Sequence, residues 1–464
     1  MYKYIKNFST LFCAFFIMIF IKSDLVYSVN TFSQVLEGFD WGPCVTKMVI
    51  KLDKEVSGGN KGMLSESSFS VITTKRGYES ETATETEERK VIKAYTSDEK
   101  GNYINNLTNY ITLELLCNPN AGNPFFYNIF ETYRNEWSVP YTSQITLNKD
   151  VTIGEVTLSS DTFSVNEEPT KNHLILIDDV FVNGTHTYAG ETLGYAYHKC
   201  KYENNKGLVI WIHGMGEGGT DTTIELLGNK VTALANKTIQ NDLNNNCDIL
   251  VIQTPTYWLD TSKEGKEQFT PNKYTETLKS LVDKYVSENN IKTNRIFIGG
   301  CSMGGYMTMN MILNYPNYFA AAYFAAEAYA DEYISDEQIK SIKNIPMWFI
   351  HAENDGTVDV TKTTNATIER LKNANAKEIH YSYYIDVVDT SRLYDYVTGS
   401  QYKYDAHWSW VYLFNDECKD KSETVFTWLS KINYRLTARK DVTDSAQLIK
   451  NSIFISILLF AFIF

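Results

Sequence analysis

Apolar residues follow two different patterns in the two halves of the chain. From residue 30 to about residue 172, short alternating or β-branched runs are separated by polar, turn-rich stretches. They predict strands at residues 46–52, 69–73, 90–95, 110–116 and 141–147. A series of this kind favours an all-β sandwich over residues 30–172. The acidic, threonine-rich segment 79–89 interrupts the series, and we interpret it as a solvated loop without chemistry.

From about residue 174 the apolar runs alternate with amphipathic segments. Strands are predicted at residues 208–212, 249–253, 295–298, 347–350 and 380–385, and helices at residues 274–288 and 361–374. Because strands and helices alternate, we expect a parallel or mostly parallel sheet. Residues 174–435 are therefore expected to form an α/β domain.

Both ends of the chain carry apolar segments. Lys3 and Lys6 precede an apolar run and a small-residue cleavage pattern, which predicts a signal peptide over residues 1–28. A membrane anchor is the alternative, but the run is shorter than the ~20 residues that a spanning helix needs. Residues 436–464 join a polar spacer to an apolar tail, which predicts a GPI-attachment signal or a retained membrane anchor. We expect a secreted protein, either free or tethered at the cell surface.

Charge and cysteine content narrow the class of partner. The net charge of −13 and the lack of a basic cluster argue against nucleic acid, which needs concentrated Lys and Arg. The cysteines beyond the expected signal peptide allow disulfides in an oxidising compartment, but the sequence does not choose their pairing. They show no metal-type pairs, so neither a metal site nor a cofactor is expected. Asn-x-Ser/Thr sequences that could carry glycans occur at Asn106, Asn183, Asn236 and Asn365.

A Gly-x-Ser-x-Gly sequence lies between a strand-like and a helix-like run, and it centres on Ser302. A serine on such a sharp turn has its hydroxyl lifted clear of the sheet, and the close approach of the chain requires Gly300 and Gly304 to lack side chains. The amide of Met303, at the start of the helix, could donate to an oxyanion. Ser302 is thus a candidate nucleophile.

A serine nucleophile needs a histidine base and an acid, which are expected to follow it in the order Ser, Asp, His. His407 lies in a late loop, whereas His380 lies within a segment whose alternating pattern predicts a strand. His407 is therefore the preferred base. Asp355 follows the strand 347–350 and is the preferred acid, because active-site groups of open α/β sheets gather at the carboxyl ends of strands. The rival acids are Glu353, Asp359 and Asp386.

A second glycine cluster follows the strand 208–212, and there the amide of Met215 could supply another oxyanion donor. No Gly-Lys-Ser/Thr follows these glycines, which argues against a phosphate loop. His213 and His351 are expected to shape their loops. Trp408 and Glu327 are candidate pocket residues, although the aromatic residues near His407 could equally belong to the core.

The segments IFIGGCSMGGYMTMNMILNYP, IPMWFIHAENDGTV and AHWSWVYLFNDEC resemble secreted α/β-hydrolase esterases, often described as predicted peptidases or prolyl-oligopeptidase-like hydrolases. In that group an immunoglobulin-like domain precedes the hydrolase domain, and FDWGPCVTKMVIKL and KAYTSDEKGNY resemble that leading domain. The resemblance implies Ser302 as nucleophile, Asp355 as acid and His407 as base. Met303 departs from the group, where Asn is frequent, but its amide would serve equally.

These residues predict a serine carboxylesterase that acts on a small-molecule or polysaccharide-linked ester, with acyl or feruloyl groups on extracellular polysaccharide as candidate substrates. Two alternatives stay open. The first is a serine peptidase of the prolyl-oligopeptidase-like group, which shares the same three side chains. The second is a catalytically silent hydrolase-fold adhesion protein, which loss of one of the three would favour, and none is lost. The sequence leaves the oligomeric state undetermined.

Overall fold

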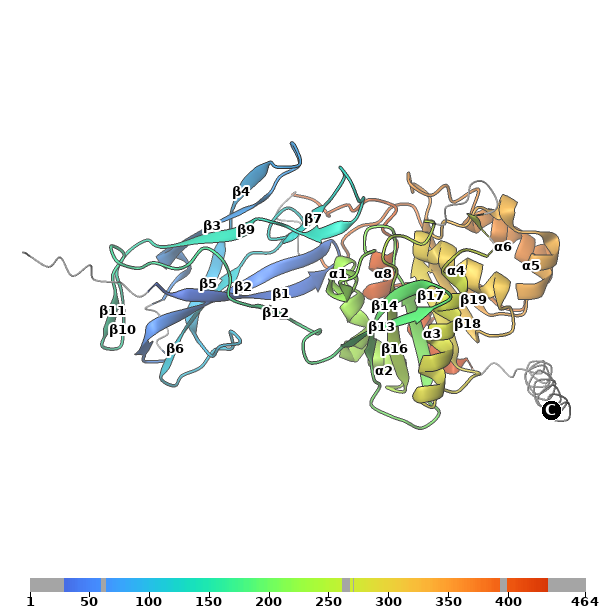
Figure 1. The fold of residues 1–464 in the computed structure, drawn as a ribbon, viewed down its shortest axis with the longest axis horizontal. Helices are drawn as coiled ribbons and strands as arrows, with labels where there is room; N and C mark the ends of the chain where they lie inside the picture. Colours follow the sequence, from blue (N-terminus) through green and yellow to red (C-terminus); the bar gives the residue numbers. More distant parts are fainter. Residues whose placement is uncertain (1–28, 60–63, 261–267, 270, 393–398, 433–464) are drawn as a thin grey trace, which may run out of the picture.

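The structure is a computed structural model that describes residues 29–59, 64–260, 268–269, 271–392 and 399–432. The expected signal peptide and the C-terminal tail lie outside these residues. An all-β domain is followed by a domain in which helices surround a central sheet, and the two are joined side by side (Figure 1).

The leading domain is a sandwich of two sheets. The larger sheet has the order β12-β1-β2-β6-β5, and the smaller has the order β4-β3-β9. Their inner faces enclose a core that includes Phe32, Met48, Val71 and Leu113. The strands are β1 (Thr31–Phe39), β2 (Gly42–Val56), β3 (Phe69–Arg76), β4 (Thr84–Glu88), β5 (Val91–Ser97), β6 (Thr108–Leu115), β9 (Tyr141–Leu147) and β12 (Asn172–Leu174). The predicted all-β sandwich is confirmed.

The interpretation of segment 79–89 as a loop is wrong for its second half. Strand β4 occupies Thr84–Glu88 and pairs antiparallel with β3. Threonine favours an extended backbone, and Lys75 on β3 forms ion pairs with Glu85 and Glu87 at 3.4 and 3.2 Å. The acidic charge of the segment is thus matched by a cross-strand partner that the local sequence does not contain.

A disulfide links Cys44 at the start of β2 to Cys117 after β6. It joins neighbouring strands of the larger sheet, 73 residues apart in sequence. Within the described residues the other cysteines are free and buried, and they are Cys200, Cys247, Cys301 and Cys418.

The second domain is built on an eight-stranded sheet of order β13-β14-β16-β15-β17-β18-β19-β20. Strands β13 and β14 run antiparallel at one edge, and the strands from β16 to β20 are parallel. The bounds are β13 (Val182–Tyr188), β14 (Glu191–His198), β15 (Gly207–Ile212), β16 (Cys247–Gln253), β17 (Ile296–Cys301), β18 (Ala321–Ala325), β19 (Met347–Ala352) and β20 (Ile379–Tyr384). The mostly parallel sheet is as predicted, and β13, β14 and β18 are added to it.

Helices cover both faces of this sheet. Apolar side chains of α3 (Thr275–Glu288), α4 (Met303–Asn314), α5 (Asp336–Ile342) and α6 (Thr364–Asn373) pack in one buried cluster. Those of α1 (Thr222–Gly228), α2 (Lys237–Asp242), α8 (Trp410–Phe414) and α9 (Val425–Lys431) pack in another. Among the described helices, none is both long enough and apolar enough to cross a bilayer.

The two domains share a continuous interface. Trp41 and Phe125 of the leading domain are buried within the same apolar cluster as α1 and α8. The short strands β7 (Phe125–Tyr127) and β8 (Asn135–Trp137) reach the second domain, where the backbone N–H of Asn135 donates to the Gly216 carbonyl at 2.7 Å. Asp40 also accepts from Lys230 at 3.0 Å. The leading domain is therefore packed against the loops at one end of the central sheet.

Candidate functional site

Ser302 stands on the turn between β17 and α4, with φ 52° and ψ −117°. Residues other than glycine rarely adopt such a positive φ, so the surrounding chain must hold the turn in place. A Cβ atom added to Gly304 would lie 2.0 Å from the Ile212 carbonyl oxygen, and one added to Gly300 would lie 2.5 Å from the same oxygen. The expected requirement for glycine at both positions is confirmed.

Asp355 follows β19 and lies between two histidines. Its Oδ2 atom is 2.8 Å from Nδ1 of His407 and 3.0 Å from Nε2 of His351. Its Oδ1 atom accepts from the amides of Thr357 and Val358, each at 2.8 Å. Burial opposes the charged form of Asp355, but hydrogen bonds from both histidines outweigh it and hold its pKa well below the usual range. Asp355 is therefore a carboxylate that can orient His407.

Three other histidines near the site or considered as the base, His213, His351 and His380, have structural contacts. His351 is buried, and its Nδ1 atom pairs with the Thr364 hydroxyl at 2.9 Å. His213 is buried, its Nε2 atom accepts from the Thr254 amide at 3.1 Å, and burial lowers its pKa to about 4. His380 stacks on Trp348 and pairs with Asp420 at 2.7 Å.

The rival acids face other partners. Asp386 forms an ion pair with Lys403 at 2.9 Å, and Asp359 accepts from the Thr361 amide at 2.9 Å. Glu353 is exposed, whereas Asp355 is buried against His407. Of these carboxylates, Asp355 is the one that meets the candidate base.

A cavity of about 600 Å³ brings Ser302 and His407 together. Met303 and Met215, whose amides are the candidate oxyanion donors, also line it. Met303 begins α4, so its N–H lies at the positive end of that helix. The arrangement places a hydroxyl, an imidazole oriented by a carboxylate, and two candidate amide donors around one space.

Six aromatic residues line this cavity, and both domains contribute to them. Trp408 and Trp410 come from the second domain, whereas Trp41, Tyr78, Phe125 and Tyr127 come from the leading domain. We call this set the aromatic vault. The prediction for Trp408 as a pocket residue agrees with its position. Nothing in the local sequence marked the four residues from the leading domain, because an alternating β pattern does not tell which residue will face another domain.

The cavity also has buried polar groups. Glu217 is 5% exposed, accepts from the side chain of Asn135 at 3.2 Å, and has its pKa raised to about 7, chiefly by burial. Trp410 is 5% exposed, and its indole N–H has no hydrogen-bond partner within the described part of the chain.

Glu327 does not line the cavity, so this pocket prediction is wrong. Its side chain is fully buried, and its carboxylate accepts from the Tyr329 amide at 2.7 Å. A Cβ atom added to Gly305 would lie 2.7 Å from the Glu327 Cα atom, which places Glu327 directly behind α4. Glu327 follows a strand and so lies near the Ser302 turn, but its side chain is buried behind α4 and does not face the cavity.

In the part of the chain that the structure describes, no group of three or more His, Cys, Asp or Glu side chains is placed to hold a metal ion.

Comparison with protein families divides the chain in the same way as the fold. Residues 31–158 match the model of the esterase Ig-like N-terminal domain, and residues 194–388 match the model of the phospholipase/carboxylesterase family. No curated protein matches the chain.

One solved esterase structure shares the fold over most of the chain. A thermostable esterase is similar over 88% of this chain and 100% of its own, with a TM-score of 0.67 and 24% identity. An acetyl xylan esterase from Aspergillus awamori covers 39% of this chain and 76% of its own, with a TM-score of 0.31 and 17% identity. A ferulic acid esterase covers 44% and 88%, with a TM-score of 0.35 and 11% identity. The likeness to the thermostable esterase is the one that shows a shared fold.

Proposed function

We propose that this chain is a serine carboxylesterase. It joins an esterase Ig-like N-terminal domain to an α/β-hydrolase domain of the phospholipase/carboxylesterase family. The protein is a hydrolase that acts on esters. In our proposal Ser302 is the nucleophile, His407 the general base and Asp355 the acid that orients it. The substrate is a carboxylic ester with a bulky aromatic acyl group, such as a feruloyl group, carried on extracellular polysaccharide.

The observation that carries this assignment is the contact between Asp355 and His407 at the cavity that Ser302 lines. With Nδ1 of His407 held by the carboxylate, its Nε2 atom remains to accept a proton. His407 takes the proton of the Ser302 hydroxyl as the oxygen attacks the ester carbonyl, and Asp355 stabilises the resulting imidazolium. His407 then gives the proton to the leaving alcohol, which departs from an acyl-enzyme.

The negative charge that develops on the carbonyl oxygen needs donors that are already in position. We assign this role to the amides of Met303 and Met215. Water enters after the alcohol leaves, His407 removes its proton, and the acid product is released with Ser302 restored.

The aromatic vault supports a bulky acyl group. Six rings offer flat apolar faces, and an aromatic acid stacks on such faces with less loss of conformational freedom than a flexible chain.

We also place the enzyme outside the cell. The disulfide between Cys44 and Cys117 supports an oxidising compartment. Whether residues 436–464 serve as a GPI signal or as an anchor stays a prediction, since they lie outside the described residues.

The test compares the wild-type chain with Ser302→Ala on aryl esters of graded acyl size, on feruloylated and acetylated sugars, and on prolyl peptides. We expect ester turnover that falls by about 10⁶-fold in Ser302→Ala, and a higher kcat/KM for the feruloyl than for the acetyl sugar.

Asp355→Asn serves as a second variant, with an expected loss of about 10⁴-fold in kcat. Equal turnover by Ser302→Ala and wild type would contradict the assignment. Peptide cleavage without ester cleavage would favour a peptidase, and inactivity on every substrate would favour the adhesion protein.

A further inference from the structure

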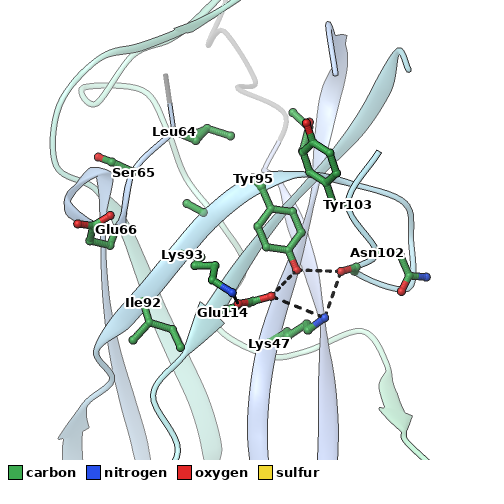
Figure 2. Close-up of a pocket in the computed structure, with 13 residues that line it drawn as sticks. Lys47, Leu64, Ser65, Glu66, Ile92, Lys93, Tyr95, Asn102, Tyr103 and Glu114 are labelled. Atoms are coloured by element: carbon green, nitrogen blue, oxygen red, sulfur yellow. Dashed lines mark hydrogen bonds and ion pairs between the residues drawn. The ribbon is translucent and has the colours of Figure 1, made fainter. Parts of the chain in front are cut away.

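We propose that a hollow in the leading domain is a second binding site, and that it binds an uncharged carbohydrate chain. The site goes beyond the esterase reaction, although the choice of polysaccharide as the source of the carbohydrate rests on the proposed function. Figure 2 shows its residues, which we call the sheet hollow.

The sheet hollow lies on the outer face of the larger sheet. Lys47 on β2 is paired with Glu114 on β6, while their neighbours Met48 and Leu113 point into the core of the sandwich. The hollow has a volume of about 690 Å³, within the range of small-molecule sites. Its lining shares no residue with the cavity at Ser302. The two sites are therefore separate.

Two tyrosines give the hollow an aromatic surface. The rings of Tyr95 and Tyr103 meet edge to face, with centroids 6.0 Å apart. Tyr103 is 44% exposed, and Ile92, across the hollow, is 41% exposed. A sugar ring has an apolar C–H face that stacks on an exposed aromatic ring, and burying that ring removes apolar surface from water.

Polar groups beside these rings are joined by hydrogen bonds and ion pairs. The Glu114 carboxylate accepts from the Tyr95 hydroxyl at 2.9 Å and lies 2.9 Å from Nζ of Lys93. Lys47 approaches the same carboxylate at 4.0 Å and donates to the Gly101 carbonyl at 3.4 Å. Figure 2 shows this network between Asn102 on one side and Glu66 on the other. Donors and acceptors that are ordered before binding suit hydroxyl groups, which both donate and accept.

The charges of the hollow balance. Its lining contains the cations Lys47 and Lys93 and the anions Glu66 and Glu114. A phosphate group or nucleic acid would need an excess of positive charge, and a cation would need an excess of negative charge. A neutral polyol needs neither, so a carbohydrate fits the hollow better than an ion.

A second site for the polymer would raise the concentration of ester groups near Ser302. Once the sheet hollow holds the polysaccharide, the encounter between its ester groups and the active site becomes intramolecular. The apparent affinity for the polymeric substrate then rises without a new contact at the reacting bond. The effect applies to polymeric substrates and not to small esters.

The test measures binding of the Ser302→Ala chain to three neutral polysaccharides, arabinoxylan, galactomannan and mixed-linkage glucan, by retardation in native gels. We expect at least one polysaccharide to retard the protein. Tyr103→Ala in that background should weaken the interaction about tenfold, because one stacking contact is lost. Lys93→Ala, a change at a 67% exposed side chain, should weaken it too and provides a second variant if Tyr103→Ala does not fold.

The matched control is Tyr202→Ala, which removes a 50% exposed tyrosine from the second domain. It should leave retardation unchanged. With Ser302 intact, Tyr103→Ala should keep its kcat/KM on an aryl acetate and lose several-fold on the polymer-borne ester. Retardation that is equal in the Tyr103→Ala, Lys93→Ala and Ser302→Ala proteins overturns the proposal, as does the lack of any retardation. Failure of the esterase proposal is seen separately, as turnover that does not depend on Ser302.

Discussion

Two buried carboxylic acids near the same cavity have pKa values shifted in opposite directions. Asp355 is held ionised by two histidines, whereas Glu217 has its pKa raised from 4.5 to about 7, chiefly by burial. Hydrogen bonds decide the difference, because those to Asp355 outweigh its burial and those to Glu217 do not. At neutral pH the Asp355 carboxyl group is therefore ionised, whereas the Glu217 carboxyl group is close to its pKa and is partly protonated.

Glu217 therefore makes stability depend on pH. Its folded pKa lies above the unfolded value, so its contribution is present in full below pH 4.5 and is lost as the pH rises to about 7. The loss amounts to something on the order of 3 kcal/mol. Gln cannot ionise but still accepts from Asn135. We expect Glu217→Gln to reduce the fall in free energy of unfolding between pH 5 and pH 8, measured by denaturant titration at each pH.

The control for this experiment is Glu332→Gln, at an exposed position. It should keep the wild-type pH dependence. A wild-type pH dependence in Glu217→Gln as well would show that Glu217 titrates in the folded protein as it does in the unfolded chain.

At the scale of elements, the turn between β17 and α4 is the most tightly constrained segment of the site. Gly304→Ala would place a methyl group 2.0 Å from the Ile212 carbonyl oxygen, where backbone must move to admit it. We expect a loss of about 3 kcal/mol in stability and of about 10²-fold in kcat, since Ser302 and the Met303 amide move with the turn. Thermal unfolding and ester turnover measure the two effects.

Gly356→Ala is the matched control, because a methyl group there meets nothing within 4 Å. It should leave both quantities near the wild-type values although it adjoins Asp355. Normal activity in Gly304→Ala would mean that the turn tolerates displacement.

Elements with a strong local pattern could be predicted from the sequence. The predicted strand 141–147 coincides with β9, and helix 274–288 differs from α3 by one residue. By contrast, β18 has the sequence AAYFA, whose alanines carry little preference for strands. The strand gains its place from backbone pairing with β17 and β19.

The three candidate catalytic residues could be predicted from two rules, which are their order along the chain and their position after the ends of strands. Ser302, Asp355 and His407 each follow from such a rule, and the structure brings Asp355 and His407 into contact. The vault could not be predicted, since Trp41 and Trp408 line one cavity only when the two domains pack. The expectation that His351 supports the loop of the acid agrees with its contact to Oδ2 of Asp355.

At the scale of the whole molecule, the domain interface positions one wall of the cavity. Asp40 is 8% exposed and accepts from Lys230 at 3.0 Å and from Asn415 at 3.1 Å. Asp40→Ala removes the acceptor and leaves a partly buried ammonium group with fewer partners. We expect a loss of about 2 kcal/mol and a lower kcat/KM for bulky esters than for acetate esters, measured by calorimetry and by kinetics on both.

Asp179→Ala provides the comparison, because Asp179 is 87% exposed and its ion pair with Lys100 spans 3.7 Å. Exposed pairs of this kind contribute little, so stability and selectivity should stay near wild type. If Asp40→Ala lowers kcat/KM equally for acetate and bulky esters, the interface does not shape the vault.

In the proposed assignment, the division of the vault between two domains separates the reacting groups from most of the rings that would contact the acyl group. Ser302, Asp355 and His407 all belong to the second domain, whereas four of the six rings belong to the first. Substitutions in the leading domain can therefore accumulate, or the domain can be exchanged for that of a relative, without altering the reacting groups. Under this proposal, substrate preference would be set largely by the leading domain, so selection or protein engineering could change specificity while the reaction itself stays the same.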